Sequence, residues 1–146
     1  MKTKHILFTY ITLLFFPPLV AGEEIDIVIE NHIKTELSEI DREGFEVQGS
    51  KLADLNNDKK QEIVFVWTRL GPTYWKNYLT ILKNHNGKYV HSATFALNGL
   101  ASLEKIKNNK IIVSQTVYAP EDPICCPSID KKITYTFKDD DINKEQ

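Results

Sequence analysis

Short apolar runs separated by turn signals fill the chain from Gly44 onward, and they constrain its fold more than any other feature. The most apolar run is EIVFVWTR, residues 62–69, whose β-branched and aromatic residues are typical of a buried strand. Asn86-Gly87 and Asn108-Asn109 lie between neighbouring runs and are typical of tight hairpin turns. The spacing therefore predicts an antiparallel meander. Its seven expected strands span residues 45–52, 62–69, 78–83, 88–95, 100–106, 110–118 and 131–137.

Residues 23–41 carry the spacing of an amphipathic helix. Apolar residues recur every three or four positions from Ile25 to Ile40, and charged residues occupy the other faces. Gly44 supplies a stop signal shortly after this segment. We therefore predict the α+β class, with one N-terminal amphipathic helix packed on an antiparallel β-meander of about seven short strands.

The first 22 residues have the layout of an export signal. Two lysines precede an apolar stretch over residues 6–16, and Pro17-Pro18 precede small residues that suit cleavage near Gly22. This stretch is too short to cross about 30 Å of hydrocarbon, which disfavours a retained membrane anchor. The sequence predicts a signal peptide over residues 1–22 that is cleaved, and a mature chain in the periplasm or outside the cell.

Composition narrows the classes of partner. The chain has 18 Lys+Arg against 20 Asp+Glu, and loss of the signal leaves 16 basic residues and a net charge of −4. A nucleic-acid-binding domain would show a basic patch, so we expect no nucleic-acid partner. We expect one soluble domain over residues 23–138, a charged flexible tail over 139–146, and no stable membrane insertion.

Oxygen-bearing side chains alternate along the segment 54–62, D-L-N-N-D-K-K-Q-E. They are Asp54, Asn56, Asp58 and Glu62. A hard cation such as Ca²⁺ binds six to eight oxygen atoms, which alternating side chains of a tight loop can supply. An Asx-rich turn without metal explains the same residues, because Asp and Asn side chains accept hydrogen bonds from their own backbone. Both interpretations stay open.

The acidic segment resembles the calcium loops of the FG-GAP and VCBS-type repeat families, whose pattern is D-x-[DN]-x-D-G-x-x-[DE] followed by an apolar strand. The resemblance covers residues 54–63 and implies that the four side chains and the Lys60 carbonyl bind Ca²⁺. Those families usually carry glycine at the fourth and sixth positions, where this chain has Asn57 and Lys59.

Cys125 and Cys126 are adjacent, and the chain has no other cysteine. Thiols of an exported protein are usually paired. Adjacent Cα atoms lie about 3.8 Å apart, below the usual range for disulfides, so a bond between these residues needs a strained ring. We favour a vicinal disulfide, while free buried thiols, disulfides to another chain and a redox or nucleophilic role remain alternatives.

The cysteines belong to a proline-rich loop over residues 120–127, which three prolines stiffen. We expect Asp122, Cys125 and Cys126 to contribute to a binding surface there. The string D-P-x-C-C-P, combined with the acidic segment, resembles a group of small exported bacterial proteins.

A second candidate interaction loop spans residues 70–77. Tyr74, Trp75 and Tyr78 lie in or next to it, and aromatic side chains give large contact areas at low entropic cost. The alternative is that these aromatics support the sheet and contact no partner.

No catalytic motif accompanies these features. There is no G-x-S-x-G or phosphate-binding glycine loop, and His32, His85 and His91 show no metal-ligand spacing. We therefore expect a periplasmic binding protein that is not an enzyme, an inhibitor or immunity-type protein with a protein partner in the envelope. One alternative is a calcium-stabilised structural or ligand-binding module. The other is a hydrolase or thiol-redox protein with Cys125, Cys126 or the acidic segment beside a histidine.

Overall fold

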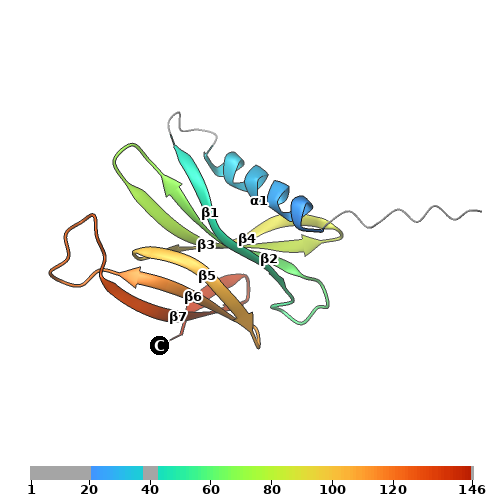
Figure 1. Ribbon diagram of the computed structural model, residues 1–146. Helices are drawn as coiled ribbons and strands as arrows, with labels where there is room; N and C mark the ends of the chain where they lie inside the picture. Colours follow the sequence, from blue (N-terminus) through green and yellow to red (C-terminus); the bar gives the residue numbers. More distant parts are fainter. Residues whose placement is uncertain (1–20, 38–42, 146) are drawn as a thin grey trace, which may run out of the picture.

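One helix and eight strands make up the part of the chain that the structure, a computed structural model, describes: residues 21–37 and 43–145 (Figure 1). They are α1 (Ala21–Leu37), β1 (Gly44–Ala53), β2 (Glu62–Leu70), β3 (Trp75–His85), β4 (Lys88–Leu97), β5 (Leu100–Lys107), β6 (Lys110–Val117), β7 (Ile129–Lys138) and β8 (Asp141–Lys144). The seven expected strands all form, within a few residues of their expected ends.

The strands form two antiparallel sheets, in the orders β1-β2-β3-β4 and β5-β6-β7-β8. The predicted α+β class with a single meander is therefore wrong, because the fold is mostly β. The expected N-terminal position of the helix is also wrong, since α1 begins at Ala21. The predicted signal peptide falls largely on residues 1–20, outside the described residues, as does the expected helix end after Leu37.

The sheets separate at Asn98-Gly99, between β4 and β5. This pair resembles a hairpin turn in the sequence, but the two strands belong to different sheets. Gly99 has a φ of 73°, and a Cβ there would collide with the Thr116 carbonyl oxygen. Alternation of apolar residues predicts strands without saying where one sheet ends, which explains the incorrect single meander.

Three two-residue hairpin turns have left-handed backbone at their tips. They are Asn86-Gly87, Asn108-Asn109 and Asp139-Asp140. Positive φ at both central residues fits the right-handed twist of the flanking strands, and Asn, Asp and Gly tolerate it best. The third turn lies in the segment expected to be a flexible tail, which instead pairs as β8 and buries Ile142.

The main core lies between the sheets, and a second apolar layer lies under α1. Ile29 and Ile33 of the helix pack against Phe65 and Trp67 on the outer face of the first sheet. The opposite face of β2 enters the main core through Val64 and its neighbours. Burial on both faces explains why β2 reads as a continuous apolar run. Among the described residues, no helix has the length and apolarity needed to cross a membrane.

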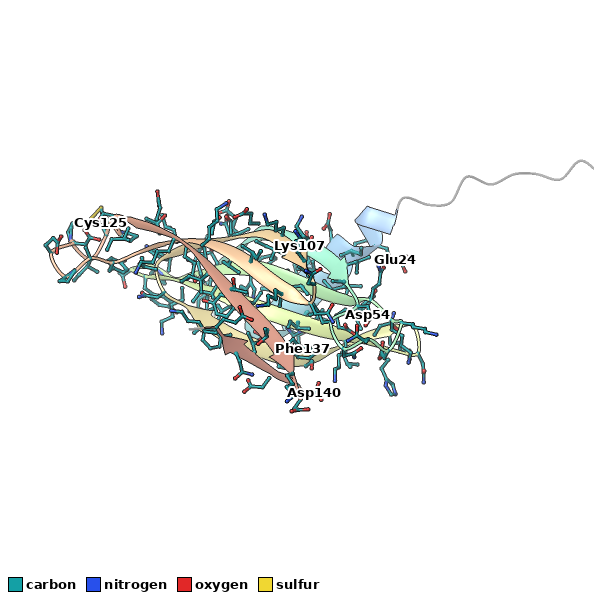
Figure 2. All side chains as sticks on the ribbon, turned by 90° about the horizontal axis from the view of Figure 1, so that it is seen from below. Glu24, Asp54, Lys107, Cys125, Phe137 and Asp140 are labelled. Carbon is teal, nitrogen blue, oxygen red and sulfur yellow. A yellow bond between two sulfur atoms is a disulfide. The ribbon has the colours of Figure 1, made fainter. Side chains whose placement is uncertain are left out.

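The connections divide between two ends of the sandwich. At the turn end lie the three hairpin turns and the acidic loop 54–61, and at the loop end lie the β2–β3, β4–β5 and β6–β7 connections. A hydrogen bond from Asn109 Nδ2 to Asn57 Oδ1, 3.2 Å long, joins the two sheets at the turn end. Figure 2 shows Cys125 at one extremity of the molecule, with Asp54 and Asp140 toward the other.

Candidate functional site

The β6–β7 connection, residues 118–128, projects from the loop end (Figure 1). The Asp122 carboxylate joins the two bases of this loop. It accepts hydrogen bonds from the backbone N–H groups of Ala119 (2.7 Å) and Ser128 (2.8 Å), and from the Ser128 hydroxyl (2.8 Å). The Ala119 hydrogen bond, followed by those of Ser128, holds the pKa of Asp122 below its usual value. The ionised carboxylate thus fixes the loop shape at neutral pH.

The tip of the same loop is cross-linked. Cys125 and Cys126 form a vicinal disulfide, as the sequence favoured. The Tyr118 hydroxyl donates a 2.7 Å hydrogen bond to the Ile124 carbonyl, and the Cys126 N–H donates to the Pro123 carbonyl at 3.0 Å. These bonds hold the backbone of the loop tip, while the side chain of Ile124 is 93% exposed to solvent. The loop therefore presents an apolar side chain to solvent on a braced backbone.

Exposed apolar side chains gather at the loop end. Eight large hydrophobic residues are exposed in the described part of the chain, and five of them lie in or beside the connections at this end. The five are Leu70, Tyr74, Leu100, Ile124 and Ile129. The positive-φ residues of the turn end, by contrast, are Asn, Asp, Lys and Gly. Exposed apolar groups of this kind are typical of protein-binding surfaces.

A pocket of about 630 Å³ opens between the sheets at the loop end. Its lining includes Gln48, Thr68, Asn77, Gln115, Asp130 and Lys132. The buried amide of Asn77 accepts from the Thr68 hydroxyl and donates to the Gly99 carbonyl, both at 2.6 Å. Gln115 accepts from the hydroxyl of Tyr135, and burial raises the pKa of Tyr135 to about 12. The bond to Gly99 ties β3 to the β4–β5 connection between the two sheets, and together these bonds give the pocket a polar floor that the sequence analysis did not anticipate.

The three predicted aromatic binding residues do not share one exposed face. Tyr74 is 44% exposed, and its hydroxyl donates to the Glu43 carboxylate. Trp75 is half-buried, and Tyr78 is half-buried with its ring stacked on Trp67 at 4.9 Å. Tyr74 alone of the three is therefore available as a large contact surface.

The acidic loop has left-handed backbone at its two unusual positions. Asn57 and Lys59, which replace the glycines of the resembling families, have φ values of 62° and 66°. The Asp54 carboxylate accepts from the N–H groups of Asp58 (3.2 Å) and Lys59 (2.9 Å), and the Asn56 Oδ1 accepts from Asp58 N–H (2.9 Å). These hydrogen bonds also fit the alternative of an Asx-rich turn.

Glu62 is the unusual member of this loop, because it is 1% exposed and has no cationic partner among the described residues. Its Oε2 accepts from Leu55 N–H at 2.8 Å, and Asn56 Nδ2 lies 3.5 Å from Oε1 and 3.3 Å from Asp58 Oδ2. Burial raises the pKa of Glu62, and the negative charges of Asp58 and Asp54 raise it further. The oxygen set fits Ca²⁺ in chemistry, although the Asn56 amide would have to rotate to admit the ion.

Two of the histidines that appeared scattered in the sequence meet in the structure. His32 of α1 stacks on His91 of β4 with ring centroids 5.4 Å apart and an interplanar angle of 10°. Burial lowers the pKa of His32 and His91 lowers it further, while the Glu36 carboxylate opposes this effect. The spacing of His32 and Glu36 over one helical turn is the only sequence signal of this cluster, because the position of His91 depends on tertiary packing.

The structure keeps the cysteine loop apart from the acidic loop, since Figure 2 shows Cys125 and Asp54 toward opposite ends of the molecule. Both cysteines are held in the disulfide, while His91 contacts His32 and Thr94. Searches against protein-family models, curated proteins and solved structures find no match to this chain. The geometry of the loop end therefore carries the functional inference.

Proposed function

We propose that this protein is an exported binding protein of the inhibitor or immunity type, which inserts its 118–128 loop into an envelope-acting enzyme or toxin. The observation that carries the proposal is the 93% exposed side chain of Ile124 on a loop braced by Asp122 and a vicinal disulfide. Burying an aliphatic side chain of this size in a partner is worth about 1.5–3 kcal/mol.

Bracing matters because an ordered loop loses little conformational entropy on binding. The tip of the 118–128 loop is held by the Tyr118 hydroxyl and the Cys126 N–H, and its bases are held by Asp122. The other exposed apolar side chains of the loop end, among them Leu100 and Ile129, extend the surface that a partner would cover. The mildly acidic mature chain would suit a partner with a basic rim.

The test uses the mature chain, residues 23–146, as bait in an envelope extract and culture supernatant. The wild-type protein should retain one stoichiometric partner, and Ile124→Asp should weaken that partner at least about 30-fold, as expected for a hot spot of about 2 kcal/mol. Ile27→Asp is the matched control, because Ile27 is 60% exposed on α1 and away from the loop. A partner that binds Ile124→Asp as tightly as wild type would contradict the proposal, as would capture of no partner.

Export is part of the same proposal. The signal-like residues 1–22 support it, and cleavage near Gly22 would give a chain beginning at Glu23. The intact mass of the protein recovered from the periplasm or medium would show this. A full-length chain that stays in the cytoplasm would contradict export and, with it, a partner in the envelope.

A second candidate is a calcium-stabilised module, favoured by the left-handed backbone at Asn57 and Lys59 and by the buried carboxylate of Glu62. A cation bound only to the native state raises the melting temperature, and at 100 times its Kd it adds about 2.7 kcal/mol. The mature protein, stripped with EDTA, should then melt higher in millimolar CaCl₂, and Asp58→Asn should lose most of this increase. A melting temperature that calcium does not change would exclude this function.

A further inference from the structure

We propose that His32, Glu36 and His91 form a binding site for a divalent transition-metal ion of the zinc type, which links helix α1 to strand β4. One ligand atom from each residue lies within 4.8 Å of the other two. In the described part of the chain, no other trio of His, Cys, Asp or Glu meets this condition. The site is independent of the acidic loop and of the proposed partner-binding loop.

The helix and the strand each contribute part of the site. His32 and Glu36 are four residues apart on α1, so both side chains leave the same face of the helix. His91 lies on β4, and its ring stacks on the ring of His32. The helix is otherwise held on the sheet by its apolar face, through residues such as Ile29 and Ile33. A shared ion would add a polar cross-link beside this apolar contact.

The contact between His32 and Glu36 has the form expected of two ligands of one ion. Glu36 Oε1 lies 3.0 Å from His32 Nε2, yet this buried nitrogen has no hydrogen-bond partner within the described residues. The two atoms are thus in close contact without meeting the full geometry of a hydrogen bond. Two ligands about 2.0 Å from a tetrahedral zinc ion are about 3.3 Å apart, and each directs its lone pair at the ion and away from the other ligand.

The donor set selects the class of metal. Two imidazole nitrogens and one carboxylate oxygen suit Zn²⁺, Cu²⁺ or Ni²⁺, whereas Ca²⁺ and Mg²⁺ prefer oxygen ligands alone. Three protein ligands leave a fourth tetrahedral position for water or another ligand. His91 Nε2 also lies 3.0 Å from the Thr94 hydroxyl, which is 3.0 Å from the Thr80 hydroxyl. Such outer contacts orient the imidazoles of metal sites.

The test measures Zn²⁺ binding to the untagged mature protein after removal of metals with a chelator. Competition with a chromogenic zinc chelator should give one site per chain with a Kd below about 10 µM. His91→Ala and Glu36→Gln should each weaken binding at least about 30-fold. His85→Ala is the matched control, because His85 is an exposed histidine outside the cluster.

Stability gives a second readout. Saturating ZnCl₂ should raise the melting temperature of the wild type and of His85→Ala by at least about 3 °C, and that of His91→Ala by less than about 1 °C. His91 and Glu36 are chosen because both are exposed, so these variants should fold. Zinc binding weaker than about 10 µM, or binding that persists unchanged in His91→Ala, would overturn the proposal.

Discussion

The two ends of the sandwich are built on different principles. At the turn end, Asn, Asp and Gly residues with positive φ reverse the chain in two residues, and their side chains are polar. At the loop end, the buried amide of Asn77 donates to the Gly99 carbonyl in the segment between the two sheets, and a braced loop carries the exposed Ile124. The comparison indicates that backbone conformation closes one end, whereas side-chain hydrogen bonds shape the connections at the other.

The largest expected effect compares two asparagines of β3. Asn77 is 1% exposed and bonds both Thr68 and the Gly99 carbonyl, whereas Asn84 accepts one exposed hydrogen bond from Gly87 N–H. Asn77→Ala should cost about 2–4 kcal/mol of unfolding free energy, because two buried partners lose their hydrogen bonds. Asn84→Ala should cost less than about 1 kcal/mol. Urea denaturation measures both, and equal losses would contradict the contrast between the two ends.

The turn end should respond to backbone conformation. Asp139 has a φ of 53° at the tip of the β7–β8 turn, and a β-branched residue is strained there. Asp139→Val should cost about 1–2 kcal/mol, while Asp139→Gly should stay within about 0.5 kcal/mol of wild type. Thermal denaturation of both variants tests this, and an unaffected valine variant would show that the turn can relax.

Glu62 should behave as a carboxylate that destabilises the metal-free protein. Because burial raises its pKa in the folded state, stability should fall as pH rises through the ordinary carboxyl range and up to the raised value. Glu62→Gln keeps an acceptor for Leu55 N–H and removes this charge, so in EDTA at pH 7 it should melt about 2–4 °C higher than wild type. The same variant should no longer respond to CaCl₂. A lower melting temperature in EDTA would contradict this account.

The smallest effect on global stability is expected at Asp122. Its pKa is lowered in the folded protein, so its hydrogen bonds should persist above the ordinary aspartate range and be lost as pH falls through the lowered pKa. The amide proton signals of Ala119 and Ser128 should report this loss in an NMR pH titration. Asp122→Asn should perturb both signals at neutral pH and leave the melting temperature nearly unchanged. A large fall in melting temperature would show that the loop also supports the core.

Local features were predictable from the sequence, and long-range ones were not. The turn residues Asn86-Gly87 and Asn108-Asn109 specify hairpins through their own backbone preferences, and the run 62–69 specifies a buried strand. The division into two sheets depends on how the chain leaves Asn98-Gly99, which only packing against β6 decides. A single meander was therefore expected where two sheets form.

The candidate sites show the same limit. The vicinal disulfide was the favoured interpretation because the two cysteines are adjacent in a chain that is expected to be exported. The meeting of His32 and His91 requires α1 to cross the first sheet at one particular register, which no local pattern encodes. The pocket between the sheets is similarly built from six strands.

The central claim, that the 118–128 loop is the partner-binding element, is tested most directly by photo-crosslinking. A photoreactive amino acid placed at position 124 should give one discrete covalent adduct in intact cells. The same group at position 27, which is also an exposed isoleucine, should give none. An adduct at position 27 with none at position 124 would contradict the claim and move the binding surface to helix α1.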